Sequence, residues 1–220
     1  MLHIQNADIR YGDRRLFQPL TLTIAKTEMA VITAPSGLGK SSLLRWIAGL
    51  ETENMTAEGD IFLNEKAITH LPAEKRKIGL IFQAPLLFPH MSVGDNLGFG
   101  MAATKQKQDN GKTRKQHITE ALERAGLGGM ENRDPETLSG GQKARVALLR
   151  TLLAEPEALL LDEPFSSLDG EMRDQMVNLI QSESQRLKLP VLLVSHDPRD
   201  HQLGQKPPIT FKACCEPFYR

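Results

Sequence analysis

The chain has 220 residues, a length that suits one large domain or two small ones. Hydrophobic residues make up 40% and charged residues 25%, which excludes a fibrous or disordered protein. Lysine plus arginine and aspartate plus glutamate are both 27. Because there is no basic excess, we expect neither nucleic acid nor anionic lipid as the main partner.

Targeting signals are not visible in the sequence. The segment MLHIQNADIRYG lacks a basic start followed by an apolar core, and the apolar runs 158–161 and 190–194 are too short to span a bilayer. Cys214 and Cys215 are adjacent, and neighbouring cysteines seldom form a structural disulfide. We expect a soluble chain in a reducing compartment that reaches any membrane through a partner.

Strand patterns alternate with helix patterns along the chain. The residue patterns predict strands over 2–9, 15–24, 29–34, 77–82, 158–162 and 190–196, and a hairpin over 58–68. Helical spacing predicts helices over 40–50, over a long apolar segment after Ser139, and over 170–188. This alternation favours an α/β fold with a parallel sheet that is covered on both faces.

The region from about 85 to 135 differs in character, because it contains no β-branched apolar run. Apolar residues at 118, 121, 122 and 125 fit a helix, so we predict a helical insert here. The polar run KQKQDNGKTRKQ, 105–116, is interpreted as a solvated loop rather than a binding patch. The strand at 190–196 is predicted to be the last, and 201–220 is left as a divergent, poorly ordered tail.

The segment APSGLGKSS lies between a predicted strand and a predicted helix, the context that a phosphate-binding loop requires. In such a turn backbone N–H groups converge on an anion, Lys40 reaches the β- and γ-phosphates and Ser41 ligates Mg²⁺. An ordinary turn is the alternative, but a lysine there opposes the helix dipole unless an anion binds. The predicted nucleotide-binding residues are Ala34, Pro35, Ser36, Gly37, Leu38, Gly39, Lys40, Ser41 and Ser42.

Ala34 is the one departure from the G-x-x-x-x-G-K-[ST] pattern. If its φ is negative, alanine fits at little cost, whereas a positive φ would strain the loop by about 1 kcal/mol. We expect nucleotide binding to survive with modest weakening, because Gly37, Gly39, Lys40 and Ser41 remain.

The segment ALLLDEP places two carboxylates at the end of a buried strand, the edge where open α/β sheets bind ligands. Asp162 is predicted to hold Mg²⁺ through water, and Glu163 to accept a proton from the water that attacks the γ-phosphate. The alternative is a pair of solvated acids that merely ends a strand.

The segment LSGGQ predicts a second anion-binding helix terminus. Ser139 suits a helix N-cap, and Gly140 and Gly141 leave backbone N–H groups bare. A plain serine cap explains neither both glycines nor Gln142, because glycine weakens a helix start. Two chains packed head to tail would use both anion-binding helix N-termini, the one after the phosphate loop and the one at LSGGQ. Each LSGGQ would close over the nucleotide of the other chain.

Together these motifs resemble the nucleotide-binding subunit of an ATP-binding cassette (ABC) transporter. APSGLGKSS, LIFQAPLLFPHMSVGDNLGFG, LSGGQKARVALLR, ALLLDEPFSSLD and LLVSHD follow in the family's order over about residues 2–198. The resemblance implies one P-loop NTPase domain of the ABC ATPase fold, with a mostly parallel core sheet. It further implies a core with an N-terminal antiparallel β-subdomain at 1–84 and 155–200, an inserted α-helical subdomain at 85–154, and the tail.

The resemblance also implies roles for single residues. Gln83 would ligate Mg²⁺ or orient water, His196 would contact the γ-phosphate and the attacking water, and Tyr11 would stack on adenine. Asp169 would lie at the dimer interface. The implied catalytic residues are Glu163, His196 and Gln83, the metal ligands are Ser41, Gln83 and Asp162, and the contacts across the dimer are Ser139, Gly140, Gly141, Gln142 and Asp169.

The family implies ATP and Mg²⁺, a second copy of the chain, and permease subunits that contact residues 83–93. The LFPHMSVGDNLGFG segment is similar to the same segment in the ATPase subunits of importers for thiamine, iron, polyamines, sugars or oxyanions. Such an ATPase would work with a periplasmic or extracellular solute-binding protein, on the cytoplasmic face of the inner (plasma) membrane.

Three rivals remain beside this interpretation. An ABC ATPase of DNA repair or chromosome organisation would need a coiled coil between Lys40 and LSGGQ, where no heptad run occurs. A P-loop kinase has no use for LSGGQ. A non-catalytic regulatory paralogue is favoured by Ala34 and the unusual tail, and is opposed by intact Glu163 and His196.

Overall fold

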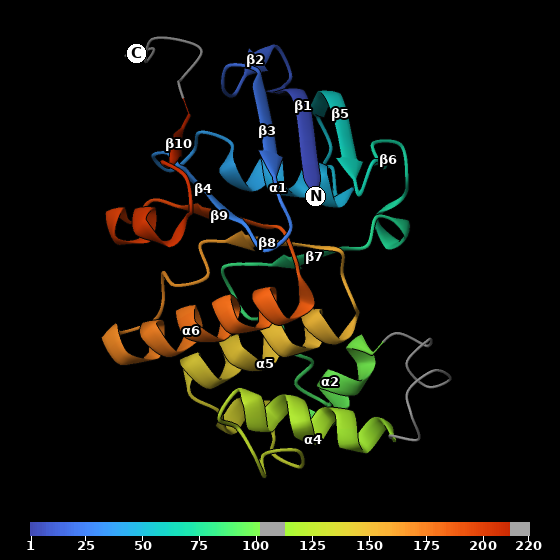
Figure 1. Cartoon of the computed structure of the whole chain (residues 1–220), viewed down its shortest axis with the longest axis vertical. Helices are drawn as coiled ribbons and strands as arrows, with labels where there is room; N and C mark the ends of the chain where they lie inside the picture. The colour runs from blue at the N-terminus through green and yellow to red at the C-terminus, as the bar shows by residue number, and fades with distance from the viewer. Residues whose placement is uncertain (102–112, 212–220) are drawn as a thin grey trace. The chain divides into compact units, whose positions relative to one another are not determined.

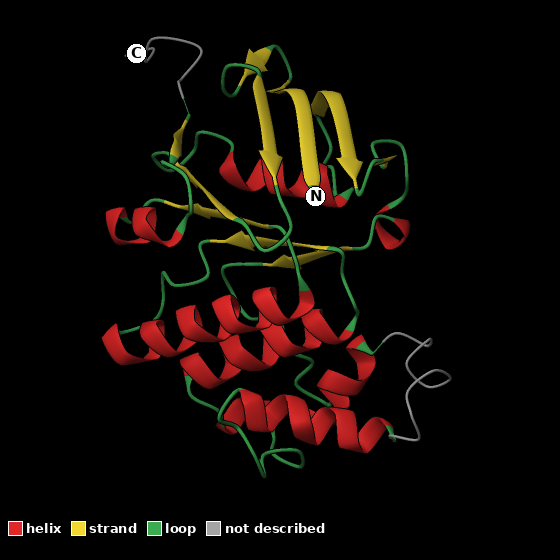
Figure 2. Cartoon of the chain, viewed as in Figure 1, coloured by secondary structure: helices red, strands yellow, loops and turns green. Residues whose placement is uncertain are grey.

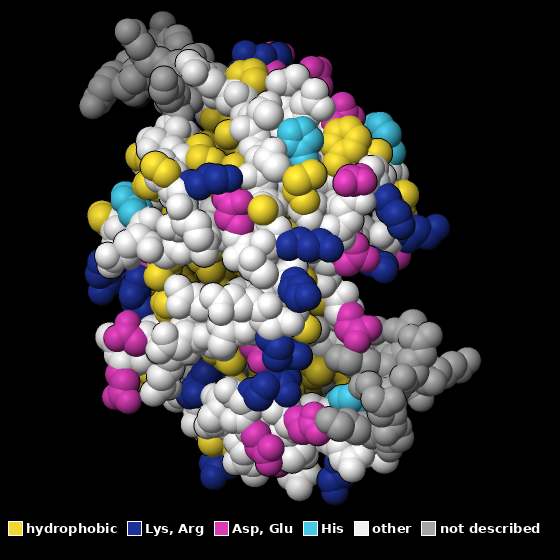
Figure 3. Space-filling model, viewed as in Figure 1, with side chains coloured by type: hydrophobic (Ala, Val, Ile, Leu, Met, Phe, Trp, Pro, Cys, Tyr) yellow, Lys and Arg dark blue, Asp and Glu magenta, His cyan; other side chains and the backbone are white. Residues whose placement is uncertain are grey.

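The computed structural model describes residues 1–101 and 113–211. These residues form two compact units. Unit 1 contains Met1–Leu80, Glu157–Glu163 and the described residues from Lys188 onward, and unit 2 contains the described residues of Ile81–Pro156 and Pro164–Leu187. No helix in the described part of the chain is long and apolar enough to cross a membrane. The viewed face of each unit carries charged side chains of both signs (Figure 3).

An antiparallel sheet forms the first part of unit 1 (Figure 1). Its strands are β1 (Leu2–Tyr11), β2 (Arg14–Arg15), β3 (Leu20–Ile24), β5 (Met55–Leu63) and β6 (Lys66–Ala67). They run in the order β2-β1-β5-β6, and β3 also pairs with β1. The predicted strand over 2–9 and the hairpin over 58–68 are therefore confirmed, and β1 continues to Tyr11. The predicted strand over 15–24 is correct only at its two ends, because residues 16–19 separate β2 from β3.

The second sheet has the order β10-β4-β9-β8-β7. Its strands are β4 (Met29–Thr33), β7 (Ile78–Ile81), β8 (Ala158–Asp162), β9 (Val191–Ser195) and β10 (Ile209–Thr210). β9 pairs in parallel with both β4 and β8, so Thr33 lies opposite Ser195 and Asp162 opposite Val194. Because the carboxyl ends of parallel strands meet at one edge, the segments that follow these three strands come together there.

Helix α1 (Lys40–Ala48) joins the two sheets into one core, since it packs against both β1 and β8. Leu43, Leu44 and Ile47 are completely buried in that core. The spacing of these apolar residues is the helical pattern on which the predicted helix was based. The helix ends at Gly49, which adopts the left-handed conformation typical of a C-cap.

Unit 2 is built of helices, drawn in red in Figure 2. They are α2 (Val93–Gly100), α4 (Arg114–Arg124), α5 (Gly140–Leu153) and α6 (Gly170–Leu187). Helix α5 packs against the other three. The helical insert is confirmed, and Ile118, Ala121 and Leu122 are buried as expected. Short 3₁₀ turns occur in the chain at Ala73–Lys75, Pro135–Thr137 and Pro198–Leu203.

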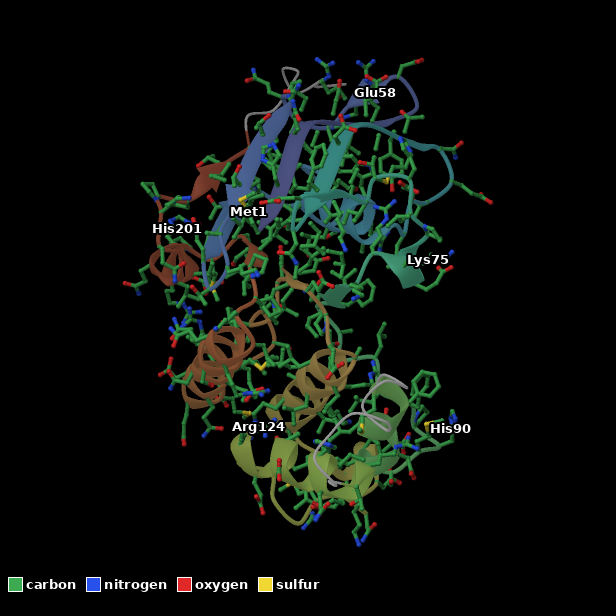
Figure 4. All side chains as sticks on the ribbon, turned by 45° about the vertical axis from the view of Figure 1, so that its right-hand side comes forward. Met1, Glu58, Lys75, His90, Arg124 and His201 are labelled. Carbon is green, nitrogen blue, oxygen red and sulfur yellow. The ribbon has the colours of Figure 1, made fainter. Side chains whose placement is uncertain are left out.

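A buried carboxylate ties α4 to α6. Glu183 on α6 accepts hydrogen bonds from Arg124, labelled in Figure 4, and from Arg186. Burial would raise the pKa of Glu183, but the hydrogen bond from Arg186 and the positive charges of both arginines outweigh it, so its pKa is lowered. The ionised carboxylate therefore holds the two helices together.

Two predictions about irregular segments were wrong in part. The strand β9 is not the last, because β10 pairs in parallel with β4 and Phe211 stacks on Phe17 with ring centroids 4.3 Å apart. The tail is thus ordered as far as residue 211, and 212–220 lie outside the described residues. The run 105–116 falls mostly outside them too, but its end is helical, because α4 begins at Arg114 behind a capping box formed by Thr113.

Candidate active site

The phosphate-loop segment follows the buried strand β4 and leads into α1, as predicted. Gly37 and Gly39 have φ angles of 82° and 85°, the left-handed region that favours glycine. A Cβ at Gly39 would also lie 2.7 Å from Cδ1 of Leu16, so both the backbone conformation and the lack of space disfavour alanine there. Gly39 caps α1 without any side-chain hydrogen bond, which leaves the first backbone N–H groups of the helix available to an anion.

Ala34 fits its place in this loop. Among the described residues, the non-glycine positions with positive φ do not include it. The residue is 5% exposed and belongs to the core cluster that contains Leu43 and Ile47. The extra methyl therefore packs in the interior at no cost in backbone strain.

Restoring glycine at this position should not improve nucleotide binding. We expect Ala34→Gly to leave the Kd for Mg-ATP within about threefold, because the backbone already has a conformation that alanine accepts. The variant should unfold about 0.5–1 kcal/mol more easily, since glycine adds conformational freedom to the unfolded chain. Fluorescent-nucleotide titration and urea unfolding measure the two effects. An affinity gain of several hundredfold would contradict this account and show that the wild-type loop is degraded.

Lys40 is buried, with 5% of the residue exposed. Its Nζ donates to the carbonyl oxygens of Ala34, at 2.6 Å, and Pro35, at 3.3 Å. The same ammonium lies 3.3 Å from Oε1 of Glu163. Since these contacts are made with the loop itself and with the predicted base, phosphate oxygens that reach Lys40 would compete with them.

Ser41 and Asp162, two of the predicted metal ligands, are in contact, because Ser41 Oγ donates to Oδ1 of Asp162 at 3.0 Å. Both groups are hard oxygen donors, the kind that holds Mg²⁺ either directly, as the Ser41 hydroxyl would, or through the ion's bound water, as the Asp162 carboxylate would. Burial raises the pKa of Asp162 above its usual range, the Ser41 hydroxyl opposes this, and the nearby charge of Glu163 adds to it. A cation at this place would relieve the cost of the buried charge.

Glu163 is held in an unusual conformation directly after β8. Its φ is 47°, in the left-handed region where a side chain costs roughly 1–2 kcal/mol, and its N–H donates to the carbonyl of Val194. Oε2 of the carboxylate lies 2.9 Å from Nδ1 of His196, which follows β9. The strained backbone thus places Glu163 between Lys40 and His196, both predicted site residues.

Tyr11, at the end of β1, is 36% exposed. Its hydroxyl forms a hydrogen bond with Oγ1 of Thr52, at 2.6 Å. Thr52 lies in the connection between α1 and β5. No local pattern predicted this partner, because 41 positions separate the two residues.

The signature segment in unit 2 corrects one step of the sequence argument. Ser139 caps α5, and Gln142 completes a capping box by accepting from the Ser139 N–H at 2.9 Å. A Cβ at Gly141 would lie 2.7 Å from Sδ of Met172 on α6, whereas a Cβ at Gly140 would meet nothing within 4 Å. Helix capping and helix packing therefore account for Gln142 and Gly141, and only Gly140 remains without an internal reason.

The other two predicted residues of unit 2 are Gln83, which follows β7, and Asp169, which directly precedes α6. Gln83 is exposed, and its Nε2 donates to Oγ of Ser166 at 3.3 Å. Asp169 is exposed and accepts from the N–H of Met172, so it caps α6. Ser166 was not expected as a partner of Gln83. Unit 1 thus unites Lys40, Ser41, Asp162, Glu163 and His196, while unit 2 carries Gln83, Asp169 and the signature segment.

Comparison with known proteins identifies the family. The family model described as ABC transporter matches residues 17–166. The chain belongs to the ABC transporter family. The uncharacterized ABC transporter ATP-binding protein YnjD of Escherichia coli K12 is 45% identical over 200 residues, which are 91% of this chain and 90% of YnjD.

Importer ATPases are also similar to this ABC protein. The maltose/maltodextrin import ATP-binding protein MalK of Escherichia coli K12 is 40% identical over 89% of this chain. The Fe(3+) ions import ATP-binding protein FbpC of Escherichia coli O157:H7 is 38% identical over 89% of it. The chain spans about half the length of these two relatives, 51% of MalK and 55% of FbpC.

A solved structure shares the fold. The ATP-binding cassette MJ0796, in a dimeric post-hydrolysis state bound to ADP and Pi, matches with a TM-score of 0.80 and 27% identity. The match covers 96% of this chain and 94% of that one. The predicted ABC ATPase fold is therefore confirmed, and the chain is an ATPase of this family.

Proposed function

We propose that this ABC ATPase energises solute import by driving a membrane complex through cycles of ATP binding and hydrolysis. The observation that carries the proposal is the position of Glu163, which contacts both Lys40 and His196 beside the Ser41–Asp162 pair. A phosphate-binding lysine, a carboxylate base and a histidine in contact form the set that hydrolysis of a γ-phosphate needs.

The residues of unit 1 divide the chemical work between them. The loop N–H groups and Lys40 bind the β- and γ-phosphates, which frees Glu163 from Lys40. Glu163 Oε2 then accepts a proton from the attacking water, and His196 donates a hydrogen bond toward the γ-phosphate. Ser41 and Asp162 would hold Mg²⁺, the latter through water, and the ion would neutralise the charge that develops on the phosphates. Tyr11 presents its ring to adenine.

The signature segment is proposed to complete the site of a second copy. The dimeric structures of MJ0796 support this assembly. Gly140 is exposed at the start of α5 and leaves room for an anion next to the bare N–H groups. Ser139, Gly141, Gln142 and Asp169 are proposed to lie at the same interface. Gln83 is proposed to sense the metal or the attacking water.

Residues 83–93 are proposed to contact the permease subunits. In this segment Leu86 is 58% exposed, and Phe99 on α2, which packs edge-on against Phe88, is 64% exposed. Two side chains fix the backbone of this segment by hydrogen bonds. Asn96, which is fully buried, donates to the carbonyls of Phe88, Met91 and Ser92. Arg150 donates to the carbonyl of Leu86. A rigid loop with exposed apolar side chains suits docking of a partner helix.

The assembly follows from this docking. The permease subunits would hold the chain at the cytoplasmic face of the plasma (inner) membrane, and a solute-binding protein would deliver solute from the other side. The names of MalK and FbpC support an importer, and we propose that it belongs with the importers of thiamine, iron, polyamines, sugars or oxyanions. The division into a core at 1–84 and 155–200, a helical subdomain at 85–154 and a tail is also proposed.

The membrane proteins encoded beside this gene provide the test of transport. In proteoliposomes that contain them, wild-type turnover should rise when solute and its binding protein are added. Leu86→Ser should reduce that stimulation by about tenfold, the effect of losing one apolar interface anchor, and leave basal turnover unchanged. Leu50→Ser, which alters an exposed leucine of unit 1, is the matched control and should leave both rates unchanged. Equal stimulation of all three proteins would contradict docking through this loop.

A further inference from the structure

The turn that carries His196 is tied to a buried carboxylate. Ser195, the last residue of β9, is 3% exposed, and Asp200 is 2% exposed. Ser195 Oγ donates to Oδ2 of Asp200 at 2.5 Å and accepts from the N–H of Asp197 at 3.0 Å. The N–H of Asp200 donates to the Asp197 carbonyl, also at 3.0 Å. These hydrogen bonds close the segment 195–200, which includes His196, into a hydrogen-bonded ring.

The ring is anchored on both sides. Before it, β9 is fixed by its register with β4 and β8, and the Val194 carbonyl accepts from the N–H of Glu163. After it, the 3₁₀ turn Pro198–Leu203 begins at Pro198 and contains His201, labelled in Figure 4. The carboxylate of Asp197 caps that turn by accepting from the Arg199 N–H.

His196 itself has little support from packing, because 53% of its side chain is exposed. The position of an exposed side chain at a strand end depends on its own rotamer and on the movement of its backbone. A hydroxyl that donates to a buried carboxylate forms a short, strong hydrogen bond, and linked bonds of this kind make a segment rigid. The ring therefore limits the directions in which His196 can point, with Nδ1 toward Glu163.

We propose that Asp200, acting through Ser195, is a positioning residue for ATP hydrolysis. By fixing the turn, it keeps His196 against Glu163 when the nucleotide draws Lys40 away. This inference rests on the proposed roles of Glu163 and His196, and it adds a buried pair that takes no direct part in the reaction. Because Ser195 and Asp200 hold the turn after β9 and not the phosphate-loop segment between β4 and α1, loss of the pair should affect turnover more than nucleotide binding.

Four variants of the full chain test the proposal. Asp200→Asn keeps the shape of the side chain and an acceptor oxygen but removes the carboxylate. Ser195→Ala removes the hydroxyl that links Asp200 to the N–H of Asp197. Each should lower kcat by roughly tenfold to a hundredfold, the effect of misplacing a catalytic group by about 1 Å, and leave the Kd for Mg-ATP within about twofold. Ser195→Thr restores the hydroxyl and should recover turnover. His196→Ala supplies the background for a double-mutant cycle.

The cycle separates positioning from general damage. If Asp200 acts through His196, Asp200→Asn should cause no further loss of kcat in the His196→Ala protein. Additive losses of kcat in the double variant would overturn the inference, and so would a loss of ATP affinity as large as the loss of kcat together with a lower melting temperature. Either result would leave the proposed ATPase function intact. Full turnover by His196→Ala would overturn it together with the role of His196. A wild-type chain without ATP turnover would overturn the proposed function itself.

Discussion

Glu163→Gln should bind Mg-ATP nearly as tightly as the wild-type chain and hydrolyse it about 10² to 10⁴ times more slowly, the usual contribution of a general base. Glutamine keeps the size of the side chain and an oxygen that can face Lys40, now 3.3 Å from the carboxylate. It cannot take a proton from water. Phosphate release at saturating Mg-ATP gives kcat, and a fluorescent nucleotide gives the Kd.

Glu157→Gln is the matched control for this variant. Glu157 belongs to the same unit and bonds to Lys77 and Asn64 rather than to any predicted site residue, so its variant should keep wild-type turnover. The Glu163→Gln protein should also accumulate as a dimer in Mg-ATP, because it binds ATP but does not hydrolyse it. Light scattering detects the dimer. A Glu163→Gln protein with more than about a tenth of the wild-type kcat would show that another group is the base.

The regular elements were predictable because their patterns are local. Helical spacing placed Leu43, Leu44 and Ile47 on one face of α1, and the β-branched run before it became the buried strand β4. The order of motifs then placed Ser41 with Asp162 and Glu163 with His196, since the ends of parallel strands share one edge of the sheet.

The parts that the sequence did not predict depend on contacts between distant residues. Strand β10 has only two residues, too few for a periodic pattern, and it is supported by the stacking of Phe211 on Phe17. Whether alanine fits at position 34 depends on the backbone of the folded loop, where Ala34 is not among the residues with positive φ and is buried in the core. The capping box of Ser139 and Gln142 was a local signal, but a functional interpretation of LSGGQ concealed it.

Asp162→Asn should stabilise the nucleotide-free chain by a few degrees in melting temperature at neutral pH while it impairs hydrolysis. Burial raises the pKa of Asp162, and the Glu163 charge adds to the rise although Ser41 opposes it, so the folded protein holds the proton more tightly than the unfolded chain. Stability therefore falls as pH rises from the ordinary value of 3.8 through the raised pKa. Asparagine lacks this loss, yet its oxygen still accepts from Ser41.

The same substitution should weaken Mg²⁺-dependent binding of ATP on the order of 10- to 100-fold, as loss of a group that holds a metal through water does. Thermal unfolding between pH 4 and 8, with and without Mg-ATP, measures both effects. The pH limits are about those within which an aspartate can change its charge when its pKa is raised. Stability of the variant that falls with pH as steeply as that of wild type would contradict the assigned cause.

Asp8→Asn provides a control of opposite sign in the same unit. Burial would raise the pKa of Asp8, but hydrogen bonds from Arg15 and Arg10 outweigh it and lower the pKa. The ionised carboxylate then stabilises the fold above its ordinary pKa, and that contribution is lost as pH falls through the lowered value. We therefore expect Asp8→Asn to lower the melting temperature at neutral pH and Asp162→Asn to raise it. Equal signs for the two would show that general effects of charge removal, and not the local surroundings of Asp162, govern the result.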